Sequence, residues 1–121
     1  MNPVNWFEIP ANDIQQAKSF YEAVFNIEMS LHEVEGTHMA WFPSAQGKPG
    51  ATGSLVQGEG SVPSMEGAMI YFSVEDIEAT LVRIKENGGE PLTPKIDIGE
   101  FGFFASFRDN QGNKVSIHSG T

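Results

Sequence analysis

The stretch WFEIPANDIQQAKSFYEAVF, residues 6–25, decides how the rest of the sequence is read. Its first five residues suit a strand, because successive side chains of a strand point to opposite faces. Asp13 then offers a carboxylate to the free amides of a first helical turn, and Gln16 follows at the spacing of a capping box. The apolar residues after Asp13 recur at helical spacing. The stretch therefore predicts a strand that runs directly into an amphipathic helix.

The same pattern returns 63 residues later, without a gap. Asp13 aligns with Asp76, and Trp41 aligns with Phe104. A match at a fixed period sets the architecture of a chain. Each half contains signals for one strand, one helix and three further strands. The sequence therefore predicts an α+β fold of two βαβββ modules, in which the helices cover one face of the sheet.

The boundaries of the two modules follow from composition. The first module covers about residues 4–57 and the second about residues 67–120, with a Gly-, Ser- and Pro-rich linker at 58–66. Such a composition is typical of a flexible connection. Each half alone is too small to bury both faces of a sheet. We therefore expect one domain over residues 1–121.

Strand alternation assigns the side chains of the predicted sheet to two faces. Those expected beneath the helices are Phe7, Ile9, Ile70, Phe72, Val115 and Ile117. Those expected on the uncovered face are Trp6, Glu8, Met69, Tyr71, Ser116 and His118. A shift of one residue would bury Glu8 beneath a helix, where an unpaired carboxylate costs several kcal/mol. The burial of apolar side chains therefore selects this assignment.

The charge and composition of the chain exclude several kinds of partner. The 121 residues include 16 acidic and 7 basic side chains, which give a net charge of −9. This balance argues against nucleic acid and anionic membranes as partners, since both require Lys or Arg to neutralise phosphates. The chain has no cysteine, so it has no disulfide and no thiolate nucleophile. Without a signal-peptide pattern or a long apolar run, the expected location is the cytoplasm.

The whole pattern resembles a known family. Paired βαβββ signals, opened by WFEIPANDIQQAKSFYEAVF and closed by DNQGNKVSIH at 109–118, are similar to the vicinal oxygen chelate superfamily. That superfamily includes glyoxalase I, extradiol dioxygenases, and fosfomycin- and bleomycin-resistance proteins. The resemblance covers about residues 4–119 and is nearest to glyoxalase-related proteins without an assigned reaction. It implies a curved, partly closed, barrel-like sheet with a ligand cleft and with helices on its outer face.

The resemblance also implies where a metal would bind. Metal-dependent members place His, Gln or Glu on the first strand of each module, and usually Glu on the last. These positions carry over to Trp6, Gly53, Met69 and Ser116. None suits a divalent ion, which prefers imidazole or carboxylate ligands. We therefore expect no metal and no cofactor, and neither glyoxalase I nor ring-cleaving activity. A non-standard metal site built from His38, Glu8 and His118 is an alternative.

Glu8 and His118 are the candidate catalytic residues, because a carboxylate and an imidazole that face one pocket can carry out acid–base chemistry. In the alternative interpretation, Glu8 pairs with Lys95 and His118 is an ordinary surface histidine. The candidate ligand-binding residues are Trp6, Trp41, Met69, Tyr71, Phe104 and Ser116. Their rings, thioether and hydroxyl groups offer stacking surface and hydrogen bonds.

Three functions follow from these candidates. The first is metal-independent binding of an apolar or aromatic small molecule. The second is a metal-independent lyase or isomerase that uses Glu8 and His118. The third is a non-catalytic interaction or regulatory module. We also expect a homodimer, because this is a habit of the family and because the predicted edge strand with Pro91 and Pro94 needs cover.

Overall fold

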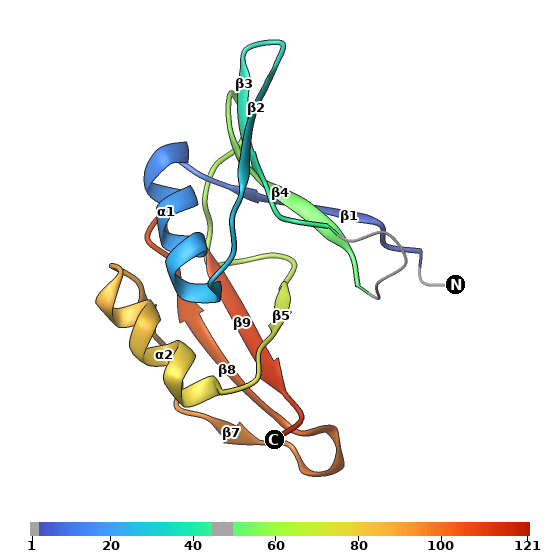
Figure 1. Cartoon of the computed structure of the whole chain (residues 1–121), viewed down its shortest axis with the longest axis vertical. Coiled ribbons are helices and arrows are strands. Elements are labelled where there is room, and N and C mark those ends of the chain that lie inside the picture. The colour runs from blue at the N-terminus through green and yellow to red at the C-terminus, as the bar shows by residue number, and fades with distance from the viewer. Residues whose placement is uncertain (1–2, 45–49) are drawn as a thin grey trace.

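The computed structural model describes residues 3–44 and 50–121 (Figure 1). The first module has one strand, one helix and three further strands. Its elements are β1 (Trp6–Pro10), α1 (Ile14–Phe25), β2 (Ser30–Val34), β3 (Thr37–Trp41) and β4 (Thr52–Gln57). They form a sheet in the order β1-β4-β3-β2, in which β1 is parallel to β4 and the other neighbours are antiparallel.

The second module repeats this arrangement with a divided edge. Its elements are β5 (Tyr71–Ser73), α2 (Ile77–Glu86), β6 (Glu90–Pro91), β7 (Ile96–Asp97), a short 3₁₀ helix η1 (Gly99–Phe101), β8 (Phe103–Arg108) and β9 (Lys114–Ser119). The sheet order is β5-β9-β8-β6, and β7 also pairs with β8. The segment between α2 and η1 is split into two short strands because its prolines cannot donate to a ladder.

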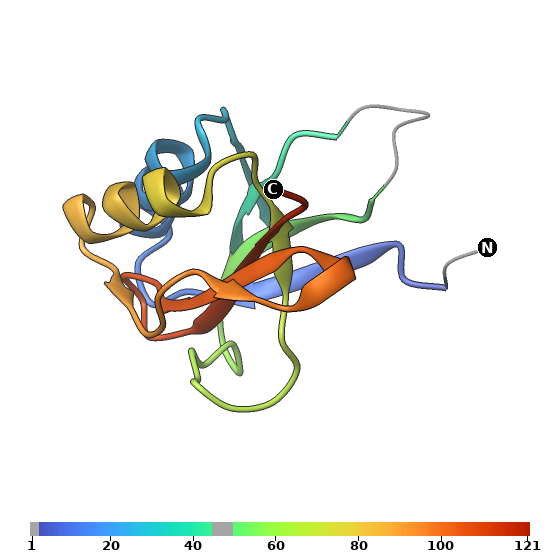
Figure 2. The same cartoon turned by 90° about the horizontal axis from the view of Figure 1, so that it is seen from below.

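The predicted α+β fold of two βαβββ modules is confirmed. The two sheets stay separate and open, and the two helices lie side by side on one side of the molecule (Figure 2). Neither helix of the described part of the chain has the length and apolar character needed to cross a membrane.

One hydrophobic core joins the two modules. The residues predicted beneath the helices all lie in this core or against it, namely Phe7, Ile9, Ile70, Phe72, Val115 and Ile117. The rings of Phe7 in β1 and Phe72 in β5 are 5.8 Å apart. The helix-covered faces of the two sheets therefore meet in the middle of the molecule, and the uncovered faces lie on its outer sides.

A turn at residues 109–113 fastens the modules together. Asp109 is buried and accepts hydrogen bonds from the amides of Gln111, Gly112 and Asn113 at 2.9–3.0 Å. The hydroxyl of Tyr21, in the middle of α1, donates to the other oxygen of Asp109 at 2.7 Å. Burial raises the pKa of the Tyr21 phenol well above its ordinary value, and the charge of Asp109 raises it further.

The same turn completes the start of α1. The side-chain oxygen of Gln111 accepts hydrogen bonds from the amides of Asn12 and Asp13, both at 2.8 Å. Asn113 donates its side-chain amide to the carbonyl of Pro10 at 2.7 Å. As predicted, Asp13 caps the helix and accepts from the amide of Gln16 at 3.0 Å. The residue that reaches back to the cap amide is Gln111 of the second module rather than Gln16.

Candidate functional site

The uncovered face of the first sheet carries a pair of indole rings. The strand register places Glu8, Ser54 and Trp41 in one row across β1, β4 and β3. The rings of Trp6 and Trp41 meet edge to face at 5.7 Å between centroids. Trp6 is 38% exposed and Trp41 is 37% exposed. A large aromatic surface is therefore open to water beside a carboxylate.

His32 of β2 packs against one member of this pair, Trp41. Its imidazole stacks on Trp41 at 3.8 Å between ring centroids, and the hydroxyl of Ser30 lies 2.9 Å from its Nε2. Sequence reasoning assigned no role to His32. The two-residue turn at Glu35-Gly36 could have indicated one, because it sets a β2–β3 register in which Ser30 is opposite Trp41 and His32 follows two residues later on the same face.

Ser54 is the residue on this face that sequence reasoning missed. Its side chain is fully buried, and among the described residues its hydroxyl has no hydrogen-bond partner. Glu8 pairs with Ser54 in the same way that its repeat-mate Tyr71 pairs with Ser116. The mate of Ser116 is therefore Ser54 rather than Gly53, because the repeat offset is 62 residues in this strand and not 63. The prediction that Gly53 occupies the metal-ligand position of this strand was therefore wrong, and Ser54 occupies it.

The uncovered face of the second sheet is built similarly. Tyr71 is 57% exposed, and its ring lies 6.4 Å from that of Phe104. Ser116 is fully buried, and its hydroxyl is 2.8 Å from the hydroxyl of Ser106 on β8. Met69 precedes β5 and, together with Tyr71, lines a large cavity between the two sheets. Unlike Ser54, Ser116 has a partner within its own sheet.

One chain does not bring the two candidate catalytic residues together. The carboxylate of Glu8 has no partner among the described residues, and Lys95 lies over the ring of Phe103 at 4.3 Å. Glu8 borders a hollow of about 210 Å³ under the linker. His118 belongs to the other sheet, where its Nε2 lies 2.7 Å from the carbonyl oxygen of Phe101. The two side chains therefore lie on different outer faces of the molecule.

The four positions at which the family resemblance implies metal ligands hold no imidazole or carboxylate. The four corresponding positions hold Trp6, Ser54, Met69 and Ser116, which lack imidazole and carboxylate groups. Within residues 3–44 and 50–121, no three His, Cys, Asp or Glu side chains are grouped so that they could hold a metal ion. The side chains at these four positions therefore do not suit a divalent cation.

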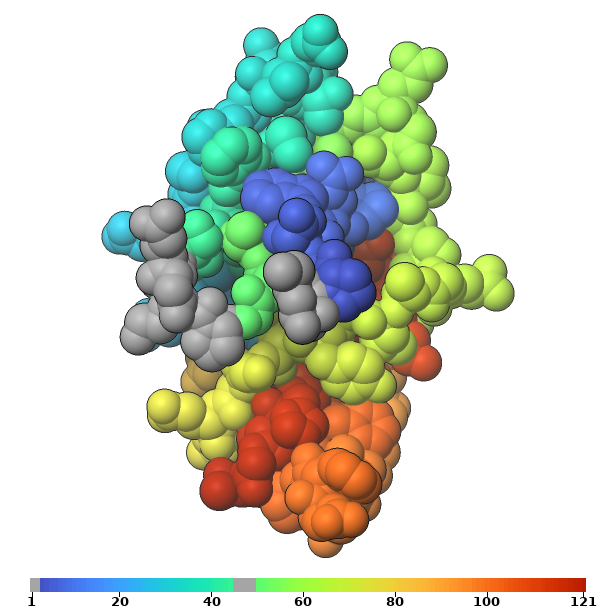
Figure 3. All heavy atoms as spheres, turned by 90° about the vertical axis from the view of Figure 1, so that its right-hand side faces the viewer, coloured from blue at the N-terminus to red at the C-terminus, as the bar shows by residue number. Residues whose placement is uncertain are grey.

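Figure 3 shows the side of the molecule from which the N-terminal segment projects. The first module (blue to green) lies above, the second module (yellow to red) lies below, and the yellow-green linker lies along one side. The two modules thus occupy separate regions of the surface in this view.

Comparison with known proteins places this geometry in context. The model of the Glyoxalase/Bleomycin resistance protein/Dioxygenase superfamily matches residues 4–117. A glyoxylase-like domain-containing protein from Didymella fabae is 32% identical over 120 residues, which cover 94% of this chain and 91% of that protein.

Solved structures with this fold include two small proteins that align over almost their whole length. A glyoxalase/bleomycin resistance protein from Albidiferax ferrireducens superposes with a TM-score of 0.73 at 17% identity, over 98% of each chain. TnmS3, an antibiotic binding protein from a Streptomyces species, superposes with a TM-score of 0.67 at 22% identity, over 100% of this chain and 98% of its own.

Proposed function

This chain belongs to the Glyoxalase/Bleomycin resistance protein/Dioxygenase superfamily, and we propose that it binds a small aromatic molecule without a divalent metal. The observation that carries the proposal is the half-exposed pair of Trp6 and Trp41 on the uncovered face of the first sheet. Exposed aromatic clusters on a folded domain mark binding surfaces, because their burial by a ligand is favourable.

The polar side chains beside the two indoles indicate which hydrogen-bonding groups the ligand should carry. A buried hydroxyl without a partner, like that of Ser54, costs about 1–3 kcal/mol. Because this hydroxyl is fully buried, a ligand oxygen or nitrogen would offset the cost by displacing the side chains that cover it. Glu8, next to it in the row, accepts hydrogen bonds from an N–H or O–H donor. The preferred ligand is therefore a flat aromatic compound with at least one hydrogen-bond donor.

The side chains at the four strand positions support metal independence. Trp6, Ser54, Met69 and Ser116 supply rings, hydroxyls and a thioether, which do not suit hard or borderline divalent ions. The same side chains suit an organic ligand. TnmS3, which shares the fold, is described as an antibiotic binding protein, and this supports small-molecule binding as a use of the scaffold.

A homodimer is part of the proposal. The uncovered faces of the two sheets lie on outer sides of the chain, so one chain leaves each of them open. Binding sites normally bury most of a ligand's surface. A second copy that sets its second sheet against the first sheet of its partner would enclose the Trp6–Trp41 pair. Light scattering at micromolar concentration should give twice the chain mass, and a monomer would contradict this part.

Binding is preferred over acid–base catalysis. Catalysis needs Glu8 and His118 within hydrogen-bond reach of the same substrate. In one chain they lie on different faces. The proposed dimer would set a second sheet, with its His118, against the first sheet, but the Nε2 of His118 already lies 2.7 Å from the carbonyl oxygen of Phe101. The exposed indoles need no such pairing to bind a ligand.

The test uses the intrinsic fluorescence of the protein. The chain has only two tryptophans, and both belong to the proposed site, so their emission reports on this face alone. Titration with flat bicyclic and tricyclic aromatic compounds should quench this emission equally with and without a chelator. Glu8→Gln and Ser54→Ala should each weaken binding by about tenfold, the scale of one lost hydrogen bond to a charged or buried group.

Glu59→Gln is the matched control, because Glu59 is an exposed carboxylate in the linker. It removes the same charge as Glu8→Gln and should leave binding unchanged. The proposal fails if no compound quenches the emission, if the chelator abolishes binding, or if the Glu59 and Glu8 variants behave alike.

A further inference from the structure

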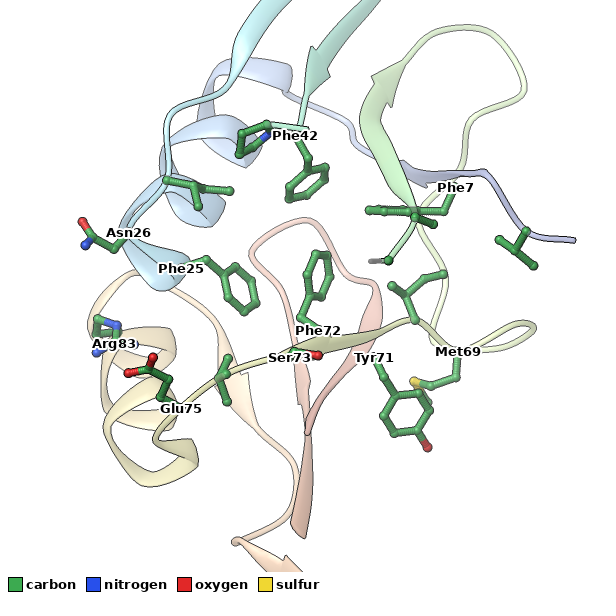
Figure 4. A pocket seen from close by; sticks show the side chains of 17 residues that line it. Phe7, Phe25, Asn26, Phe42, Met69, Tyr71, Phe72, Ser73, Glu75 and Arg83 are labelled. Carbon is green, nitrogen blue, oxygen red and sulfur yellow. The ribbon is translucent and has the colours of Figure 1, made fainter. Parts of the chain in front are cut away.

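A cavity of about 790 Å³ lies between the two modules, where Met69 and Tyr71 line it beside side chains from the helix-covered faces of the sheets (Figure 4). Four phenylalanines converge on it, namely Phe7, Phe25, Phe42 and Phe72. Phe72 is central, with ring centroids 4.7 Å from Phe25, 5.4 Å from Phe42 and 5.8 Å from Phe7. The volume falls within the range of roughly 300–1,000 Å³ that small-molecule pockets occupy.

These rings are incompletely packed. Phe7, Phe25 and Phe72 are only half-buried, whereas Phe20 and Tyr21 of the neighbouring core are at most 1% exposed. Aromatic surface that meets water inside a concave site loses both the hydrophobic gain and the dispersion contacts of a filled core. An apolar or aromatic group placed among the three rings would recover both contributions.

One end of the cavity is polar and carries a fixed positive charge. Asn26, Glu75 and Arg83 lie together there (Figure 4). Arg83 donates its Nε–H to the carbonyl of Val24 at 2.8 Å and one Nη2–H to the hydroxyl of Thr80 at 3.2 Å. A guanidinium has five N–H donors, so three of them have no partner among the described residues. These two hydrogen bonds fix the orientation of the guanidinium before a ligand binds.

The carboxylate of Glu75 does not neutralise the guanidinium of Arg83. Glu75 is exposed, and in the described part of the chain it forms no ion pair with Arg83. Its charge is therefore screened by water, whereas the guanidinium is half-buried. A planar guanidinium with free donors matches a carboxylate, because it can form two parallel hydrogen bonds to the two oxygens.

We propose that this cavity is a second binding site, specific for a carboxylic acid with an aromatic or branched apolar body. The body lies among Phe7, Phe25 and Phe72, and the carboxylate lies on Arg83. The site is separate from the Trp6–Trp41 face in position and in charge preference. Each site can therefore be tested without the other.

The test compares 2-naphthoate with 2-naphthamide, which has the same body but no charge, by isothermal titration calorimetry. The wild-type protein should bind the naphthoate about tenfold more tightly, the scale of one charge-assisted hydrogen-bonded contact. Arg83→Gln should remove this difference while leaving naphthamide binding unchanged. Phe72→Leu should weaken both compounds by about tenfold.

Lys85→Gln is the matched control, because Lys85 is an exposed cation in the last turn of the same helix and lies outside the cavity. It should preserve the preference for naphthoate. Arg83 also joins the two helices through Val24, so the melting temperature of each variant is measured as well. Arg83→Lys keeps the charge but loses the fork, and should retain part of the preference.

Three results would overturn the proposal. The first is no binding of either compound at millimolar concentration. The second is an equal loss of preference in the Arg83 and Lys85 variants, which would show a general charge effect. The third is loss of naphthoate binding in Glu8→Gln or Trp41→Phe, which would place the compound on the uncovered face instead. Failure of the tryptophan-quenching experiment leaves these measurements unaffected.

Discussion

Replacing Tyr21 by Phe should lower the free energy of unfolding by about 2 kcal/mol. The Tyr21 hydroxyl donates to Asp109 at 2.7 Å, and both side chains are buried. Hydrogen bonds to charged groups contribute about 1.5–3 kcal/mol, and the retained ring leaves no cavity. Without the Tyr21 hydroxyl, Oδ2 of Asp109 would accept a hydrogen bond only from the side-chain amide of Asn113, at 3.0 Å. For a domain of this size the melting temperature should fall by about 8 °C.

The pH dependence gives this prediction a second readout. Because the pKa of Tyr21 is raised above its ordinary value of 10.0, the native state retains a proton that the unfolded chain releases above pH 10. The resulting stability is complete below pH 10 and is lost as the pH rises above it. The Phe variant lacks this group. The difference in unfolding free energy between the two proteins should therefore shrink between pH 9 and about pH 11.

Urea denaturation followed by circular dichroism at pH 7, 9 and about 11 measures both effects. Tyr71→Phe is the control, because Tyr71 is 57% exposed and its substitution should change stability by less than about 0.5 kcal/mol. A Tyr21→Phe variant as stable as the Tyr71→Phe variant would refute the reasoning. So would a difference that stays constant up to the highest pH.

The remaining predictions concern single contacts, each followed by the same urea assay. Asn113→Ala should cost about 2 kcal/mol, because it breaks the 2.7 Å bond to the Pro10 carbonyl and leaves that carbonyl unpaired. Gly53→Ala should cost about 2 kcal/mol, because its Cβ would lie 2.6 Å from the ring of Phe7, whereas Gly120→Ala, with open space around it, should be neutral. A hydrogen bond from the backbone amide of Met29 lowers the pKa of Glu22 from its ordinary value of 4.5. The ionised carboxylate therefore stabilises the fold above pH 4.5. The loss of unfolding free energy in Glu22→Gln should disappear as the pH falls below that value.

Local signals in the sequence predicted the elements well. Asp13 and Asp76 each cap their helix through a 3.0 Å bond to the amide three residues on. These signals are reliable because a cap and the residues it satisfies are neighbours in the chain. The division of strand residues between two faces was predictable for the same reason, since it requires only alternation and the presence of a helix.

The relation between the modules was not predictable in this way. Alternation shows that Phe7 and Phe72 lie beneath helices, but it does not show that their two faces meet each other. That arrangement depends on contacts between distant residues, such as Tyr21 with Asp109. Sequence reasoning therefore expected the uncovered faces to share one cleft. It also treated the phenylalanines around Phe72 as ordinary core and did not foresee their cavity.

The one-residue error at Gly53 has a similar origin. The repeat was aligned without a gap across residues 43–53, where turn-rich sequence gives no register signal. Pairing of β1 with β4 sets the true register and brings Ser54, not Gly53, onto the uncovered face. Only the backbone hydrogen bonds of a sheet can resolve a slip of one residue.

The turn at residues 109–113 also determines the order in which the protein can fold during its synthesis. The amides at the start of α1 bond to Gln111, which the ribosome adds 98 residues after Asp13. Until that turn is made, the helix start has no complete cap and Tyr21 has no acceptor. The first half can therefore complete these contacts only after residues 109–113 have been made, and long-range contacts of this kind generally slow folding. The two modules share one topology, yet the hydrogen bonds of each module are completed only by residues of the other.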